Sequence, residues 1–401
     1  MLIQHKCLNI YYFFFSYLFV LITPQVNEPI IEPFIDYYNS CDMFILIGNT
    51  TKIENFYLNL QSTFLWTMAS IHKFKEDNTL RFIKDDIITL ENYPSNVTLH
   101  EGTIRFNHSN TLIHNFPFYQ TPDLCYLEFD SIPLAHYFKN ESFSIVNRLY
   151  MDGKISHKSF GFVFQALNIT ENKEIGYVFF GNVPNNIINS YPYKTEFYIN
   201  DYKSKEWICQ LISLQFHFEN EDNIYENHYK SYFNLDSLTS KAPKHFMEYL
   251  RENVFNKLID EKVCEYNVKW NGKDILCNCE QIKESHIKME MLISGTKFTF
   301  TGEEMFIKTN SEDKCVFFIE LNFLNENDWV IAGHFLKKYI SLFDYVNHKV
   351  VLFGKERFNI IHKEIGKSTV IKMLFQGLSL LLISCVFILI KMRLKFNTNI
   401  F

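Results

Sequence analysis

Short runs of apolar and β-branched residues recur along the chain, and segments rich in polar and turn-forming residues separate them. The clearest runs lie at residues 43–47, 160–164, 177–180, 315–319 and 349–353, and they contain the Phe, Val and Ile that strands favour. One segment differs, because apolar residues follow Pro243 at helical spacing, and Pro is tolerated in the first turn of a helix. The body of the chain is therefore predicted to be mainly β, with a helix near Pro243.

A longer apolar run lies near the start of the chain. Residues 7–22 are almost continuously apolar behind His5 and Lys6, which is typical of a signal peptide over residues 1–23. Thr23 and Pro24 follow without the small-residue pattern of a cleavage site. An uncleaved anchor is therefore the alternative.

A second apolar run predicts a membrane span near the other end. Residues 373–390 carry no charge, and Lys391, Arg393 and Lys395 follow. The run is close to the ~20 residues that cross a bilayer, so we expect a transmembrane helix over residues 373–390. Basic residues gather on the cytosolic side, which makes residues 391–401 a cytosolic tail. We expect a single-pass type I membrane protein of the secretory pathway, with its body luminal or extracellular.

Composition excludes several classes of protein. The chain has 401 residues, of which 47% are hydrophobic and 21% charged, so it is too apolar to be disordered. A net charge of −6 gives no basic surface for nucleic acid, and no nucleic-acid partner is expected. No phosphate-binding loop, zinc-protease or serine-hydrolase motif occurs, and we predict no cofactor and no metal.

Cysteines and glycosylation sequons agree with a luminal body. Of nine cysteines, Cys7 and Cys385 fall in the two apolar runs, which leaves an odd number for the body. Disulfides are expected there, because Cys277 and Cys279 are too close together for an ordinary zinc site. The sequons all precede the predicted span, at Asn49, Asn96, Asn107, Asn140 and Asn168.

Two segments repeat a short pattern. FYLNLQS at residues 56–62 and SYFNLDS at residues 231–237 share an aromatic residue, a hydrophobic residue and then Asn-Leu-x-Ser. One copy lies early in each half of the body, so the repeat indicates an internal duplication.

A series of segments resembles the pepsin-like aspartic peptidases of family A1 over residues 40–357. NLQSTFLW at residues 59–66 stands where that family has DTGSxxLW, and WVIAGHFL at residues 329–336 resembles its WILGDxFL. Between and around them, in the order of the family, lie FILIG (44–48), LYMDGKIS (149–156), FGFVF (160–164), GYVFFG (176–181), WICQLIS (207–213) and KVVLF (349–353).

This resemblance implies an all-β, mainly β, bilobal acid-protease fold with a central cleft, in addition to the transmembrane helix. It implies an N-terminal lobe over residues 30–205 and a C-terminal lobe over residues 206–357. The predicted span then leaves a juxtamembrane segment over residues 358–372. It also implies a disulfide between Cys279 and Cys315.

The family's chemistry needs two carboxylates that share one proton and activate a water molecule. The first Asp position falls on Asn59, and no Asp or Glu lies between Glu54 and Glu76 that another alignment would place there. The neighbouring Gly position holds Gln61, whereas Ser62 matches. The first lobe is therefore predicted to lack its catalytic carboxylate.

The second motif allows two alignments. An ungapped count back from Pro243 places the Asp position on Asn234. In the other alignment Asp236 and Ser237 match the family's Asp-Ser, Leu238 stands in place of its Gly, and a two-residue deletion precedes Pro243. The Ser and Thr content slightly favours the second alignment. In both, the pair of carboxylates is broken.

The family's flap hairpin is expected within residues 93–102, with Tyr93 lining the cleft. The sequence thus predicts a membrane-anchored, catalytically inactive pseudopeptidase that binds a peptide or protein in its cleft. One alternative is an active but divergent endopeptidase that uses Asp236. Another is a structural or adhesive ectodomain whose cleft is filled by Gln61, Leu238 and Tyr93.

Overall fold

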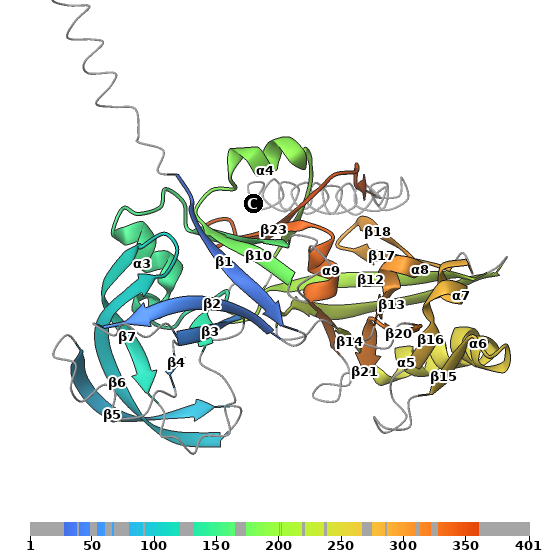
Figure 1. Cartoon of the computed structure of the whole chain (residues 1–401), viewed down its shortest axis with the longest axis horizontal. Coiled ribbons are helices and arrows are strands. Elements are labelled where there is room, and N and C mark those ends of the chain that lie inside the picture. The colour runs from blue at the N-terminus through green and yellow to red at the C-terminus, as the bar shows by residue number, and fades with distance from the viewer. Residues whose placement is uncertain are drawn as a thin grey trace, which may run out of the picture.

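The computed structural model describes residues 28–37, 40–48, 54–60, 66–67, 80–90, 93–120, 131–164, 174–199, 201, 203–218, 221–235, 239–266, 275–284, 287–308, 313–321 and 328–360. Strands predominate there, in sheets of thirteen, eight and four strands. In Figure 1 the first half of the chain lies on one side and the second half on the other, with β1 (Ile30–Tyr37), β10 (Glu174–Phe180) and β23 (Ile340–Asp344) in the middle. The predicted mainly β class is confirmed.

The thirteen-stranded sheet unites the two ends of the described chain. Its other strands are β2 (Ser40–Ile47), β3 (Glu54–Asn59), β4 (Trp66–Thr67), β5 (Arg81–Leu90), β6 (Tyr93–Phe106), β7 (Leu112–Gln120), β8 (Ser131–Pro133), β9 (Ser159–Phe164), β11 (Tyr193–Tyr198) and β24 (Lys349–Gly354). The order is β11-β24-β23-β9-β10-β1-β2-β3-β8-β4-β7-β6-β5. Residues near 350 therefore share a sheet with residues near 30.

The second half of the chain forms the two smaller sheets. The eight-stranded sheet has the order β21-β14-β22-β13-β12-β17-β18-β25, and the four-stranded sheet has the order β15-β16-β20-β19. Their strands are β12 (Ile208–Phe218), β13 (Glu221–Phe233), β14 (Ser240–Ala242), β15 (Cys264–Tyr266), β16 (Ile275–Asn278), β17 (Lys288–Ile293), β18 (Thr296–Thr301), β19 (Phe306–Lys308), β20 (Lys314–Phe317), β21 (Ile319–Leu321), β22 (Trp329–Ile331) and β25 (Asn359–Ile360).

The helices in the described residues are short. They are η1 (Glu141–Phe143), α3 (Ile145–Met151), α4 (Asn185–Ser190), α5 (Lys244–Leu250), η2 (Arg251–Phe255), α6 (Asn256–Asp260), α7 (Cys279–Glu284), α8 (Gly302–Met305) and α9 (Gly333–Lys337). The helix predicted after Pro243 is confirmed: α5, the π-helical turn η2 and α6 follow one another without a break. Phe246, Leu250, Val254 and Leu258 recur every four residues, and all are buried.

The predicted strands are found at β2, β9, β10 and β24. The run at residues 315–319 is divided between β20 and β21, because Phe318 bonds elsewhere. Its N–H donates to the Met305 carbonyl, and its carbonyl accepts from the Ser240 N–H, each at 2.8 Å. These bonds turn the chain from the small sheet into the eight-stranded one.

The expected hairpin within residues 93–102 is not formed, because these residues belong to the single strand β6. The hairpin pairs β5 with β6, and its turn lies between Leu90 and Tyr93, which are partners in the register. Tyr93 thus begins β6 at the tip of this hairpin.

Aromatic side chains from distant segments fill the core. Trp207 is fully buried, and its ring lies 5.0 Å from Phe343 and 5.9 Å from Phe160 between centroids. The polar atom of this indole is satisfied, because Nε1 donates to the Leu134 carbonyl at 2.9 Å. This cluster joins residues of both predicted lobes.

Within the residues that the structure describes, no helix is long and apolar enough to cross a membrane. The predicted signal (1–23), span (373–390) and tail (391–401) lie outside those residues.

Candidate functional site

The first of the two sequence repeats ends a buried strand. β3 runs antiparallel to β2 and parallel to β8, and the register pairs Tyr57 with Ser131 and Asn59 with Pro133. β4 then returns on the other side of β8, where Trp66 pairs antiparallel with Ser131. Ser131 is therefore opposite both Tyr57 and Trp66, so the segment 60–65 connects two strands that flank the same partner.

The second repeat has the same arrangement in the eight-stranded sheet. β13 runs antiparallel to β12 and parallel to β22, and Tyr232 pairs with Val330. β14 returns on the other side of β22, where Lys241 pairs antiparallel with Val330. One residue beyond β13, the Asn234 N–H donates to the Ile331 carbonyl at 2.9 Å.

The two registers make Asn59 and Asn234 equivalent. Ser131 and Val330 are corresponding positions in the two sheets. Each lies opposite a Tyr on the parallel strand and opposite a residue on the returning strand. Asn59 lies two residues after Tyr57, and Asn234 lies two residues after Tyr232. The connection to the returning strand also has the same length in both. The strand register therefore supports the ungapped alignment, in which both Asp positions hold Asn.

The residues around these asparagines belong to the core. Leu58 and Leu60 are fully buried on either side of Asn59, and Phe233 and Leu235 are buried on either side of Asn234, which is partly exposed. These buried neighbours anchor the end of each strand in the core, at the point where the chain leaves for the returning strand. We infer that the position of each asparagine backbone is set by packing rather than by a flexible loop.

A buried hydroxyl group links two segments of the second repeat by a hydrogen bond. Ser240, at the start of β14, accepts a hydrogen bond at its Oγ from the Ala332 N–H at 3.2 Å. This bond links the returning strand β14 to the residue after β22. Ser231, on β13, donates to the Cys209 carbonyl at 3.2 Å. Burial raises the pKa of the Cys209 thiol to about 12, so this cysteine stays protonated.

Several predicted site residues lie outside the described residues, namely Gln61, Ser62, Asp236, Ser237 and Leu238. Tyr93 is described only through its place in the backbone of β6. Among the sequon residues, Asn107 and Asn140 are exposed, whereas Asn49 and Asn168 lie outside the described residues and Asn96 is placed only within the backbone of β6. The Asn140 Oδ1 accepts from the Ser142 N–H at 3.0 Å and so caps η1.

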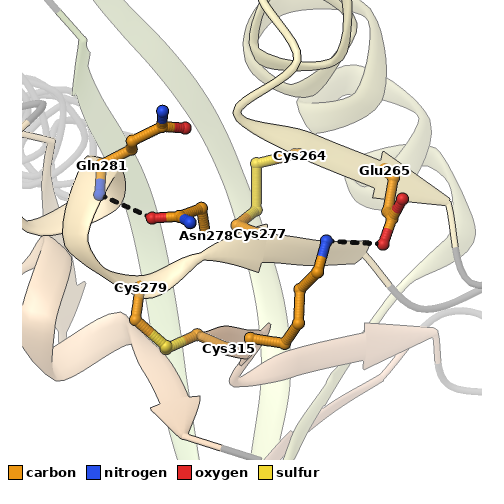
Figure 2. Close-up of a disulfide and its surroundings, with 8 residues drawn as sticks. Cys264, Glu265, Cys277, Asn278, Cys279, Gln281 and Cys315 are labelled. Carbon is orange, nitrogen blue, oxygen red and sulfur yellow. Dashed lines mark hydrogen bonds and ion pairs between the residues drawn. A yellow bond between two sulfur atoms is a disulfide. The ribbon is translucent and has the colours of Figure 1, made fainter. Parts of the chain in front are cut away.

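Two disulfides fix the four-stranded sheet, as Figure 2 shows. Cys279 is bonded to Cys315, the pairing that the family resemblance implies. The second bond joins Cys264 to Cys277, which are direct partners across β15 and β16. This second pairing could not be predicted from the sequence, because it depends on the register that places Cys264 opposite Cys277. Beside them Lys314 Nζ lies 2.7 Å from a Glu265 oxygen.

The comparisons with known proteins agree with this architecture. The model of the eukaryotic aspartyl protease family matches residues 126–354, which is more than half of the chain. The chain therefore belongs to the eukaryotic aspartyl proteases, the pepsin-like peptidases that its segments resemble. The match includes Asn234 and begins after Asn59. No curated protein sequence matches the chain.

Proposed function

We propose that this protein is a membrane-anchored pseudopeptidase of the pepsin-like family, which holds a peptide or protein ligand in its cleft without cutting it. One observation supports the proposal: the strand register makes Asn59 and Asn234 equivalent. The family resemblance assigns its catalytic Asp positions to these two residues. Family membership supports the aspartic-peptidase-like architecture, and the asparagines argue against the chemistry.

The chemical argument concerns proton transfer. A pair of carboxylates close together shares one proton, so that one member accepts a proton from water while the other donates to the substrate carbonyl. The amide of Asn has no such equilibrium in the working pH range. Asn59 and Asn234 are able to hold a water molecule by hydrogen bonds but not to deprotonate it.

The test is peptide cleavage by the full-length protein in phospholipid nanodiscs. A mixture of unrelated peptides is incubated from pH 3 to pH 7, and the products are identified by mass spectrometry. We expect no cleavage above that of empty nanodiscs, with or without pepstatin. Pepstatin-sensitive cleavage would overturn the proposal, and its loss in the Asp236→Asn variant would establish the divergent endopeptidase instead.

A second measurement addresses binding. Peptides that carry a photoreactive benzoylphenylalanine are crosslinked to the same preparation, and the attachment sites are mapped. We expect saturable crosslinks on the segments around residues 59–67 and 234–242. Crosslinks confined to other surfaces, or none, would favour the structural ectodomain with a filled cleft.

The membrane anchor is part of the same proposal and rests on the sequence of residues 373–390. Extraction of membranes at alkaline pH tests it, because a peripheral protein is released and a spanning protein is not. We expect the full chain to stay in the pellet, and a variant with charges at Leu380 and Ile383 to be released.

A further inference from the structure

A cavity of about 700 Å³ lies on a surface that the proposed function does not use. It is bordered by α4, by the ends of β9 and β18, by the residues after α9 and by the segment that follows β24. In Figure 1, α4 lies at the top of the molecule, with β23 below it and β18 to the right. None of the residues at or beside the two asparagines takes part in its lining.

The charge around this cavity is unbalanced. Its lining contains one carboxylate, Glu356, and a set of cations formed by Lys297, Lys337, Lys338, Lys355 and Arg357. Two of these cations are paired with carboxylates outside the lining: Lys297 with Glu290, and Lys338 with Glu304. On the exposed segment at residues 355–357, Lys355 and Arg357 carry two positive charges against the single negative charge of Glu356. The excess favours an anion.

Lys355 and Arg357 are the cations best placed to meet a ligand. Both are exposed, and they lie on the same short segment between β24 and β25. The Lys355 Nζ lies 5.3 Å from the centre of the Tyr191 ring, which holds the ammonium above the lining. Arginine presents several N–H donors in one plane, a geometry that suits phosphate and carboxylate oxygens.

The floor of the cavity is apolar. Val163 and Ile340 are buried members of a small hydrophobic cluster that lies apart from the main core. Ile187 and Phe358 are only partly buried, and they present apolar surface toward the cavity. A simple hydrated anion would leave this surface in contact with water, whereas a ligand with an apolar body would cover it.

We propose that this cavity binds an amphipathic anion, in which a phosphate or carboxylate head group is joined to an aliphatic or aromatic body. Lys355 and Arg357 hold the head group, and Ile187 and Phe358 contact the body. The chain's own residues 361–372 do not fit this role, because Lys363, Lys367 and Lys372 outweigh Glu364 in that segment. The inference rests on residues distinct from those of the proposed function and stands or falls without it.

The test measures binding of hexyl phosphate to the full-length protein in phosphatidylcholine nanodiscs by calorimetry. We expect one saturable site, with inorganic phosphate and hexanol each binding about tenfold more weakly, because each offers only half of the recognised chemistry. Absence of saturable hexyl phosphate binding would overturn the proposal, and so would equal affinity for hexanol.

Two variants separate the head group from the body. Lys355→Glu with Arg357→Glu should weaken hexyl phosphate binding about tenfold or more, whereas Ile187→Ser should weaken hexyl phosphate but not inorganic phosphate. The matched control, Lys154→Glu with Lys308→Glu, changes the net charge equally at exposed positions outside the cavity and should bind normally. Equal losses in the control and the cavity variant would show a nonspecific charge effect and overturn the proposal.

The natural ligand is either a membrane lipid or a soluble molecule, and the same assay distinguishes them. Nanodiscs that contain phosphatidic acid are compared with those of phosphatidylcholine alone. A lower apparent affinity for hexyl phosphate in the first preparation shows that the lipid head group occupies the cavity. An unchanged affinity assigns the site to a soluble amphipathic anion. Thermal melting of each variant confirms that it is folded.

Discussion

The Nε2 atom of His136 lies 3.1 Å from the Nδ1 atom of His348, although the two residues are far apart in the sequence. His136 follows β8, and His348 lies in the turn between β23 and β24. The other ring nitrogen of His136 lies 3.1 Å from the Ser204 carbonyl, and its ring packs against Trp207 at 4.7 Å. This partly buried contact brings together three segments that lie far apart in the sequence.

The protonation of His136 should make stability depend on pH. Burial lowers the pKa of His136 most, the Ser204 carbonyl and Asp201 oppose this, and His348 lowers it further. The folded pKa is therefore below the unfolded value of about 6.5, so the unfolded chain binds the proton more readily. Its contribution to stability is complete above pH 6.5 and is lost as pH falls toward the folded pKa.

The expected result is a free energy of unfolding that falls by up to about 1.4 kcal/mol per pH unit below pH 6.5 on account of this group. His136→Gln should reduce that slope, since Gln retains a donor for Ser204 but does not titrate. His157→Gln, at an exposed histidine, is the matched control. Urea unfolding at pH 7, 6 and 5 measures both, and identical slopes in the two variants would contradict the prediction.

Glu290 forms a second electrostatic contact that has a defined pH range. Burial alone would raise the pKa of Glu290, but hydrogen bonds from Lys288 and Lys297 outweigh it and lower the pKa to about 2. The stabilisation is present above the unfolded pKa, near 4.5, and is lost as pH falls toward 2. We expect Glu290→Gln to cost about 1–3 kcal/mol at pH 7 and much less at pH 2.

The measurement is unfolding of Glu290→Gln and the wild type at pH 7 and at the lowest pH at which both fold. Glu303→Gln is the control, because its pair with Lys283 at 3.3 Å is exposed on both sides. An equal loss of unfolding free energy for the two substitutions at pH 7 would contradict the prediction, because Glu290 would then stabilise the fold no more than an exposed ion pair does.

Gly161 is required by close packing between two strands. A Cβ at this position in β9 would overlap the Ser341 carbonyl oxygen and the Phe179 ring. We expect Gly161→Ala to cost about 3 kcal/mol, because a backbone carbonyl is unable to move aside without breaking strand pairing. Gly153→Ala meets no neighbouring atom but has a φ of +64°, and it should cost about 1 kcal/mol. Urea midpoints that rank the two in the reverse order would contradict the packing argument.

The two disulfides should differ in their contribution. The bond between Cys279 and Cys315 closes a separation of 36 residues, and that between Cys264 and Cys277 closes 13. The chain-entropy model predicts about 4 and about 3 kcal/mol, respectively. Serine pairs at each bond, compared by guanidinium unfolding, test this order. A larger loss for the shorter loop would show that native contacts outweigh loop entropy.

The family and the main elements could be predicted from the sequence. Strands such as β2, β9 and β24 are local runs of Phe, Val and Ile, and the helix after Pro243 follows from apolar spacing alone. Cys279 and Cys315 were paired through the resemblance, and the bond is present. These features depend on residues close in sequence or on a motif order shared with a family.

Tertiary structure decided what depends on register. The sequence left Asn234 and Asp236 as competing positions for the second Asp. The second repeat aligns with the first at Asn234, because β22 pairs with β13 on one side and with the returning strand β14 on the other. The bond between Cys264 and Cys277 and the contact between His136 and His348 likewise required distant segments to be placed together.

What the sequence determined by itself is the composition of the repeated motif: both copies carry Asn before Leu, and an amide side chain has the same chemistry in any fold. What only the fold decided is which residues meet, since hydrogen bonding along strands fixes their partners over hundreds of residues. The pairing of β5 with β6 shows the same limit, because the register places residues 93–102 within one long strand and not in a hairpin of their own.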